Sequence, residues 1–201
     1  MNDIFGLFSR FLKERLLSGA FTTEDSVRYT FFHALINCNY CQPLEIILEQ
    51  PHPTIQNAKV DLFIQTKGER SATAVEFKYD RPIPSEKNVP KTQKAGSVIK
   101  DLFRLARVPL EFASRRYFIY LNTPEMATYF RNPQNHMDSF FELPEGRTLL
   151  IDPNYISGNA ATFGKVLGTM PIDCKVSNVL HRDLSQKHFL RIYQIHDADR
   201  K

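Results

Sequence analysis

Two short segments in the first half of the chain combine charged side chains with strand-like runs of apolar residues. In residues 73–79 (TAVEFKY), Glu76 and Lys78 stand two positions apart, and a strand directs such residues to the same face. In residues 59–65 (KVDLFIQ), Asp61 interrupts an apolar run. Mg²⁺ prefers oxygen ligands, so one or two carboxylates suffice to hold it against a phosphate. The metal lowers the pKa of a bound water, and a nearby lysine orients that water or stabilises the transition state.

The two segments must pair as neighbouring strands for these groups to meet. A turn at residues 67–70 (KGER) would join them as a hairpin and bring Asp61 near Glu76 and Lys78. Alternation puts Asp61 on one face of its strand and three apolar residues on the other: Val60, Leu62 and Ile64. The apolar face opposite Glu76 and Lys78 consists of Val75, Phe77 and Tyr79. The competing interpretation is an ordinary solvated Glu–Lys salt bridge on an exposed strand face.

A helix is expected upstream, from about residue 22 to residue 38. Thr22 and Thr23 provide hydroxyl N-caps, and Glu24 and Asp25 follow as acidic residues of the first turn. The apolar stripe of this helix consists of Val27, Phe31, Ala34, Leu35 and Cys38. Glu24 lies three residues before the stripe and on the same side, so it is placed to project toward the metal site.

In order and spacing, these elements resemble the PD-(D/E)XK nuclease superfamily, which has the restriction-endonuclease-like fold. Val60–Asp61 stands at the position of the family's Pro-Asp half-motif, without the proline, and Glu76–Phe77–Lys78 stands for (Asp/Glu)-x-Lys. The resemblance covers about residues 20–121. It implies an α/β fold with an αβββαβ core, a central mixed sheet flanked by helices, and a C-terminal β-rich elaboration.

The resemblance also implies a role for each acidic or basic residue of the motif. Asp61 and Glu76 would bind Mg²⁺, for which Mn²⁺ would substitute. Lys78 would position the attacking water, and Glu24 would assist the metal or Lys78. For Glu24 the alternative is an ordinary first-turn acid that interacts favourably with the helix dipole.

The flanking sequence predicts the other elements of this core. Residues 43–50 (PLEIILEQ) predict a first strand that is covered on both faces, and the prolines of residues 50–53 exclude regular structure there. A proline-rich loop spans residues 80–90, and a helix runs from about residue 91 to residue 107. Residues 115–121 (RRYFIYL) predict a central strand.

The helix at residues 91–107 carries charged side chains beside its apolar stripe. In the resembling family this helix often lends a polar residue to the site or to the DNA backbone, and Lys94 and Asp101 are the candidates here. The expected nucleic-acid contacts are Lys94, Lys100 and Arg104. The alternative for each of them is a solvated helix face.

Both ends of the chain lie outside this core. Strands are expected at residues 148–151, 175–180 and 189–195. The basic residues of this part are Arg182, Lys187, His188 and Arg191. They are suited either to partner recognition or to keeping a strand edge soluble. Residues 3–17 predict an amphipathic helix that packs on its own domain, on a dimer mate or on a membrane surface.

Composition sets the remaining bounds. With 201 residues and 42% apolar content, the chain is expected to form a single domain over residues 1–201. The net charge of +4 is compatible with a polyanionic partner. Cys38 and Cys41 lack the second ligand pair of a zinc site. Free thiols and a cytoplasmic location are expected, because no targeting segment or membrane span is recognised.

The sequence thus predicts a Mg²⁺-dependent nuclease that hydrolyses phosphodiester bonds of DNA, an endonuclease of the restriction or anti-phage defence type. A partner subunit for DNA binding is one expectation, because the chain shows no separate recognition module. A homodimer is the other, because double-strand cleavage requires two active sites. The alternative is a non-catalytic nucleic-acid-binding or protein-binding module that retains the nuclease fold.

Overall fold

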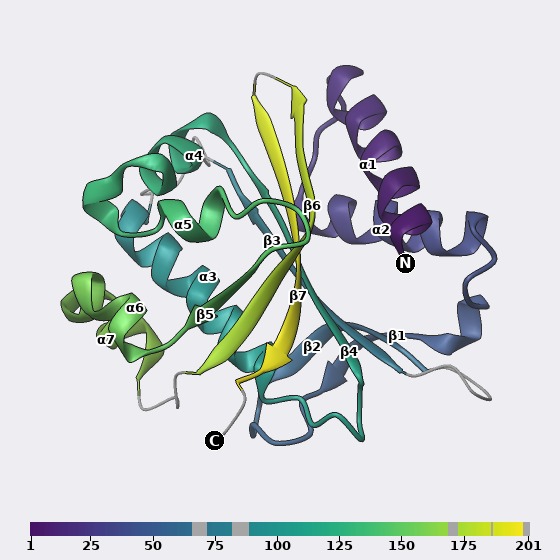
Figure 1. The fold of residues 1–201 in the computed structure, drawn as a ribbon. Coiled ribbons are helices and arrows are strands. Elements are labelled where there is room, and N and C mark those ends of the chain that lie inside the picture. The colour runs from purple at the N-terminus through teal and green to yellow at the C-terminus, as the bar shows by residue number, and fades with distance from the viewer. Residues whose placement is uncertain (66–71, 82–88, 169–172, 186, 199–201) are drawn as a thin grey trace.

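The structure is a computed structural model that describes residues 1–65, 72–81, 89–168, 173–185 and 187–198. It forms one mixed sheet between two layers of helices (Figure 1). The strands are β1 (Ile46–Pro51), β2 (Lys59–Ile64), β3 (Thr73–Asp80), β4 (Arg115–Asn122), β5 (Thr148–Ile151), β6 (Cys174–Ser185) and β7 (His188–Asp197). The α-helices are α1 (Asn2–Leu17), α2 (Glu24–Asn37), α3 (Lys91–Ala106), α4 (Pro124–Arg131), α5 (Asp138–Phe141), α6 (Pro153–Ile156) and α7 (Ala160–Leu167). Short 3₁₀ helices lie at Pro43–Glu45, Pro133–Asn135 and Ser157–Asn159.

The seven strands follow the order β1-β2-β3-β4-β7-β6-β5. β3 and β4 run parallel, and every other neighbouring pair among the described strands is antiparallel. α3 lies between β3 and β4 in the chain, as parallel neighbours require a crossover connection. The succession α2, β1, β2, β3, α3, β4 follows the predicted order of elements, and the mixed sheet flanked by helices is confirmed.

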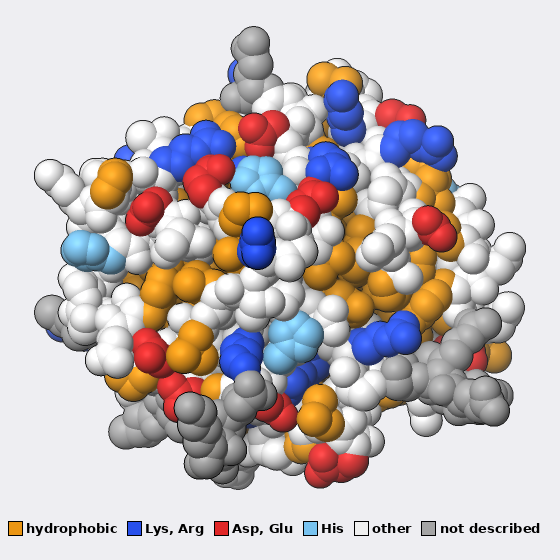
Figure 2. All heavy atoms as spheres, in the orientation of Figure 1, with side chains coloured by type: hydrophobic (Ala, Val, Ile, Leu, Met, Phe, Trp, Pro, Cys, Tyr) orange, Lys and Arg blue, Asp and Glu red, His pale blue; other side chains and the backbone are white. Residues whose placement is uncertain are grey.

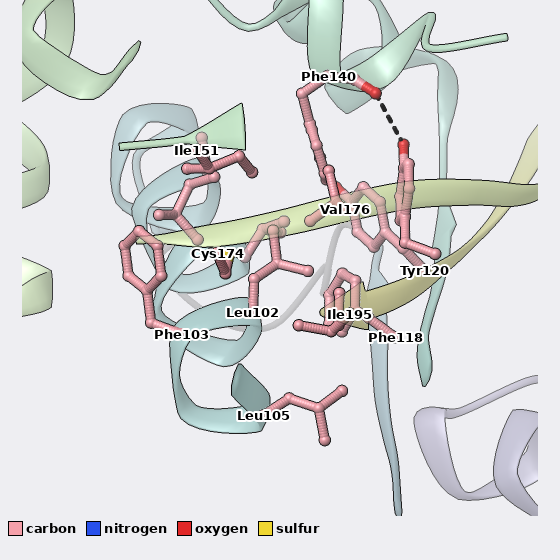
Figure 3. Packing of buried hydrophobic residues seen from close by; sticks show 14 of the residues in the cluster. Leu102, Phe103, Leu105, Phe118, Tyr120, Phe140, Ile151, Cys174, Val176 and Ile195 are labelled. Carbon is pink, nitrogen blue, oxygen red and sulfur yellow. Dashed lines mark hydrogen bonds between the residues drawn. The ribbon is translucent and has the colours of Figure 1, made fainter. Parts of the chain in front are cut away.

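Each face of the sheet is covered by its own apolar core. α1 and α2 pack on one face, where Phe31 of α2 lies against Phe77 of β3 with ring centroids 5.7 Å apart. α3 and the shorter helices α4 to α7 lie on the other side of the sheet (Figure 1). Figure 3 shows Leu102 of α3 in the same packed cluster as Val176 of β6. The central strand β3 therefore passes between two cores and presents one face to each.

β2 departs from the predicted alternation at Asp61. Leu62 packs with the α1 and α2 core, whereas Val60 packs with the α3 core, so the expectation that both share a face was wrong. The pairs on either side, Leu48 with Leu62 and Gln50 with Val60, place Glu49 of β1 opposite Asp61 of β2. Glu49 has a left-handed backbone with φ of 56°. This conformation is uncommon for a residue other than glycine, and it interrupts the regular pleat of β1. The irregularity lies beside the residue that was expected to bind metal.

β1 lies at one edge of the sheet, and β5 at the other. The expectation of a strand covered on both faces was wrong, because all of its residues are exposed or half-buried. Residues 43–45 form a 3₁₀ helix instead of the start of the strand, and Pro51 is included in the strand. Proline is tolerated on an edge because its missing N–H has no partner strand to reach.

The C-terminal strands belong to the same sheet as the predicted core. β7 pairs with β4, and β6 pairs with β7, so the strands expected near residues 175–180 and 189–195 are confirmed and are longer than predicted. The strand at residues 148–151 is confirmed as β5.

The predicted N-terminal helix forms α1 and packs on its own chain. It buries one side against α2 and the sheet through Ile4, Phe5, Phe8 and Leu12. This confirms the first of the three expected alternatives, in which the amphipathic helix packs on its own domain.

Two predicted loops lie wholly or mostly outside the described residues. These are the hairpin turn at residues 67–70 and residues 82–88 of the proline-rich loop. Within the parts of the chain that are described, no helix has the length and apolar character needed to cross a membrane.

Candidate active site

The charged residues of β3 lie where β2 and β3 separate. The antiparallel ladder between the two strands ends at Val75. Beyond it, the backbone N–H of Phe77 donates to Asp61 Oδ2 (2.8 Å), and the backbone N–H of Tyr79 donates to Glu24 Oε2 (2.9 Å). Carboxylates from β2 and α2 therefore take the place of strand carbonyls as acceptors along this edge of β3.

The local sequence fixes Glu24 at the first residue of α2. The Thr23 hydroxyl accepts a hydrogen bond from the Ser26 N–H (3.2 Å), and the Ser26 hydroxyl accepts one from the Thr23 N–H (3.2 Å). This reciprocal pair is a capping box, with serine in the position that Glu or Gln usually takes. Glu24 thus lies at the positive end of the helix dipole and also reaches β3, so the two roles considered for it are compatible.

Asp61 is held from its other side by α2. Arg28 Nη2 donates to Asp61 Oδ1 (3.2 Å), and Arg28 Nη1 donates to Glu49 Oε1 (2.9 Å). Arg28 lies one helical turn after Glu24, so both side chains leave the same face of α2. The Asp61 side chain remains 17% exposed. The carboxylate is therefore fixed in position and still open to solvent.

Glu76 is paired with α3. It is 1% exposed, and its two oxygens accept hydrogen bonds from Arg104 Nε (3.2 Å) and Arg104 Nη2 (2.6 Å). Arg104 Nη2 also lies 3.6 Å from Asp101 Oδ1, one turn earlier on the helix. Glu76 therefore lies on the α3 face of the sheet, as the alternation of β3 predicts.

Lys78 is half-buried among carboxylates. Burial alone would lower the pKa of Lys78, but the charges of Asp101, Glu24, Asp80 and Asp61 outweigh it and raise that pKa above its usual value. The side chain is consequently an ammonium ion at neutral pH. Asp80, which completes this environment, is buried and accepts a hydrogen bond from the Tyr120 hydroxyl (2.7 Å).

We call Glu24, Asp61, Glu76 and Asp101 the acidic cluster. Burial raises the pKa of Glu76 well above its usual value, Asp61 adds to the increase, and Arg104 opposes it. Burial also raises the pKa of Glu24 and of Asp101, and the nearby Lys78 opposes both shifts. The cations within reach therefore do not fully offset the burial of Glu76, Glu24 and Asp101.

The structure brings most of the predicted site residues together. Asp61, Glu76, Lys78 and Glu24 converge, and Asp101 joins them from α3. Lys94 and Lys100 are half-buried on α3, and neither has a hydrogen bond or ion pair to the acidic cluster among the described residues. Lys100 acts on Asp101 only through its charge.

Two features of the site were missed by sequence reasoning. Arg28 was not considered, and Arg104 was expected to contact nucleic acid instead of Glu76. A signal for both is present in the sequence, because Arg28 follows Glu24 by four residues and Arg104 follows Asp101 by three. Which strand residue each would meet depends on how the helices cross the sheet.

The acidic cluster has the donor chemistry for Mg²⁺, although its present geometry is not that of a metal site. Its donors are carboxylate oxygens, which Mg²⁺ prefers, and burial raises the pKa of Glu76, Glu24 and Asp101 in spite of the nearby cations. Among the described residues, no group of three or more His, Cys, Asp or Glu side chains is arranged to hold a metal ion. Both oxygens of Glu76 are engaged by Arg104.

Two hollows in the described part of the molecule lie away from this cluster. One cavity of about 580 Å³ lies at the C-terminal end of α3, beside Arg107 and Asp197. Another of about 580 Å³ lies between α1 and α2, beside Phe11 and Tyr29. On the face drawn in Figure 2, basic and acidic side chains are interspersed and apolar side chains gather across the middle. Neither cavity offers a comparable set of acids and cations.

The chain was compared with protein-family models, with curated proteins and with solved structures, and none of the three comparisons found a match.

Proposed function

We propose that this protein is a Mg²⁺-dependent nuclease that hydrolyses phosphodiester bonds of DNA. The observation that carries the proposal is the convergence of Asp61, Glu76 and Lys78 at the point where β2 and β3 separate. α2 and α3 each add an acid to the same place, Glu24 and Asp101. A salt bridge on a solvated strand face would not bury these acids together at a raised pKa, so this arrangement favours a functional site.

In the proposed site, Asp61 and Glu76 hold the metal, and Glu24 supports it from the start of α2. Bound there, Mg²⁺ would polarise the phosphodiester and favour the hydroxide form of a coordinated water. Asp61 is positioned for this by the Phe77 N–H, which fixes one of its oxygens at 2.8 Å. Arg28 Nη2 engages the other oxygen, so the carboxylate is held at the site from two sides.

Lys78 acts as a fixed positive charge. Its pKa is raised by the surrounding carboxylates, so at neutral pH it donates hydrogen bonds and does not accept a proton. A donor in this position orients the attacking water and stabilises the charge that develops on the phosphate. Asp101 and Glu24 hold the ammonium group in place by their charges.

The restriction-endonuclease-like fold is part of this proposal. Its support is the chain order α2, β1, β2, β3, α3, β4 together with the parallel pair β3 and β4. The acids and the lysine lie on β2 and β3 of this unit, as the resemblance implies. An endonuclease of the restriction or anti-phage defence type, acting in the cytoplasm as a dimer or with a partner subunit, is the form that we propose.

DNA is the proposed substrate on the basis of charge. The chain carries a net charge of +4, and α3 carries Lys94 and Lys100, of which Lys100 acts on Asp101 by its charge. Such cations bind the phosphate backbone without sequence preference, with an affinity that falls as salt rises. Lys94→Ala is expected to weaken DNA binding about equally for all sequences and to lower the salt slope by about 1.

The deciding experiment is cleavage of supercoiled plasmid with Mg²⁺ or Mn²⁺. Nicked or linear product is expected from the native protein, and Lys78→Met is expected to reduce the rate by about 10²- to 10³-fold, as for loss of one donor to a developing negative charge. Asp61→Asn should be inactive while still folded, because the amide oxygen keeps the acceptor for the Phe77 N–H. Lys13→Ala, an exposed lysine of α1, is the control for loss of one positive charge. Cleavage that survives both site changes would place the activity elsewhere.

A binding module without catalysis is the second candidate. The observation that favours it is Arg104 on both oxygens of Glu76, a geometry that a purely structural ion pair would also have. Such a module would retard DNA equally well in EDTA and in Mg²⁺. It would also tolerate Asp61→Asn without any change in affinity.

A further inference from the structure

Arg104 and Glu76 form the tightest charged contact of the acidic cluster. Nε and Nη2 of Arg104 lie 3.2 Å and 2.6 Å from separate oxygens of Glu76. Two parallel N–H donors on one carboxylate give a strong and directional pair. A divalent ion bound to Glu76 would lie beside this guanidinium, and the two like charges would repel. The guanidinium and a metal ion therefore cannot both be favoured at Glu76.

Arg104 is held in a way that permits it to leave. Its guanidinium donates to carboxylates, and no backbone carbonyl accepts from it within the described ranges of the chain. Arg116, on the neighbouring strand β4, differs because its Nη1 donates to the carbonyl oxygens of Ala106 (2.9 Å) and Val108 (3.0 Å). The Arg104 side chain is 24% exposed, so solvent lies beside it.

We propose that Arg104 occupies Glu76 in place of a divalent cation, and that metal binding displaces it so that it becomes a ligand for a substrate phosphate. This inference rests on the proposed nuclease function. A guanidinium suits both states, because its planar set of donors matches a carboxylate and a phosphate equally well. Asp101, 3.6 Å from Nη2, keeps the displaced side chain beside the site.

The exchange couples metal to substrate. Without nucleic acid, the metal must compete with Arg104 for Glu76, so its affinity is low. A phosphate that accepts the guanidinium favours the displaced state, and this raises the metal affinity by the same factor by which metal raises the affinity for DNA. The protein would therefore acquire its metal together with its substrate.

Titration with Mn²⁺ alone tests the competition, with free Mn²⁺ measured by electron paramagnetic resonance. Arg104→Gln is expected to bind Mn²⁺ about tenfold more tightly than the native protein, the size expected for removing one charge-assisted contact to a competitor. Arg107→Gln removes the same charge from the end of the same helix and is exposed, so it should leave the Mn²⁺ affinity unchanged. Glu76→Gln should weaken binding and so identifies the site.

The outcomes separate the inference from the proposed function. Equal Mn²⁺ affinity of the native protein and Arg104→Gln, with weaker binding by Glu76→Gln, would overturn the role of Arg104 and leave the nuclease proposal intact. No Mn²⁺ binding by any variant would overturn both. If circular dichroism shows that Arg104→Gln is unfolded, Arg104→Lys decides, because one ammonium cannot reproduce the two-pronged contact and should bind Mn²⁺ with intermediate affinity.

DNA binding supplies a second readout. In the Lys78→Met background, in which cleavage is slow, and with Mn²⁺ present, Arg104→Gln is expected to weaken binding of a duplex oligonucleotide about fivefold or more, since a charge-assisted contact to phosphate is lost. In EDTA the same change should alter the affinity little, because Arg104 is then engaged with Glu76. An equal effect in both conditions would contradict the displacement.

Discussion

Two arginines lie against this sheet in contrasting surroundings. Arg191 of β7 is fully buried and donates to the carbonyl oxygens of Phe141 (3.2 Å) and Arg182 (3.3 Å), and its guanidinium stacks on the Phe141 ring at 4.6 Å. Arg104 of α3 is partly exposed and is held by side-chain carboxylates. The acceptors of Arg191 are mostly backbone atoms that cannot move, whereas those of Arg104 are the acids of the candidate site.

The electrostatics of the two arginines differ in the same way. Burial lowers the pKa of Arg191, and the nearby acids do not reverse the shift. Burial acts on Arg104 in the same direction, but Glu76 and Asp101 outweigh it and raise the pKa of Arg104. One arginine completes a structural network, and the other lies where negative charge is in excess. The comparison separates an arginine that is held mostly by backbone carbonyl oxygens from one that is held by the acids of the candidate site.

The largest effect expected from this comparison is on stability at Arg191. Arg191→Met should lower the free energy of unfolding by about 3–5 kcal/mol, because it leaves buried acceptors without a donor. Urea denaturation monitored by circular dichroism measures the loss. Arg182→Met, an exposed arginine of β6, is the matched control and should change stability by less than about 0.5 kcal/mol. If Arg191→Met lowered the free energy of unfolding as little as Arg182→Met does, the structural role assigned to Arg191 would be contradicted.

A smaller and reversible effect is expected at Arg104. In metal-free buffer, Arg104→Gln should lower the free energy of unfolding by about 1–3 kcal/mol, because Glu76 is left with a weaker donor. Mn²⁺ at a hundred times its dissociation constant should restore about 2.7 kcal/mol. At the same Mn²⁺ concentration, Arg191→Met should be stabilised by Mn²⁺ only as much as the native protein is. Thermal melts with and without Mn²⁺ measure both, and equal metal responses in the two variants would contradict the assignment of separate roles.

The smallest effect concerns Glu24 and depends on pH. Its folded-state pKa is raised above the ordinary value of 4.5, chiefly by burial, so its contribution to stability is fully present below about pH 4.5 and is lost as the pH rises through the folded-state pKa. Glu24→Gln keeps an acceptor for the Tyr79 N–H but removes the charge. The variant should therefore be more stable than the native protein at pH 8, and the difference should vanish near pH 4. Urea titrations at both pH values measure this, and a larger gain at pH 4 would show the opposite sign.

The sequence predicted the elements of the site better than their contacts. α2, β2, β3 and α3 were placed within a few residues, because their apolar periodicity and the threonine cap of α2 are local signals. The convergence of Asp61 with Glu76 followed from pairing β2 with β3. Arg104 could not be assigned to Glu76, because the crossing of α3 over the sheet depends on the packing of the whole core.

Other features depended on position in the sheet, which local sequence does not encode. β1 was expected to be covered on both faces from its apolar residues, but the strand order makes it an edge. Arg191 was grouped with surface cations, yet β7 lies between β4 and β6 and buries it. The local sequence around a charged residue in an apolar strand does not reveal whether the strand lies in the centre or at the edge of the sheet.

The Asp61 and Glu24 carboxylates, which accept hydrogen bonds from the Phe77 and Tyr79 N–H groups, affect how this site can evolve. A single-nucleotide change converts aspartate to asparagine or glutamate to glutamine, and the amide oxygen still receives the main-chain hydrogen. A lineage can therefore lose the proposed chemistry of this site and keep its architecture, so relatives that carry amides at positions 61 and 24 should fold normally and have a different function.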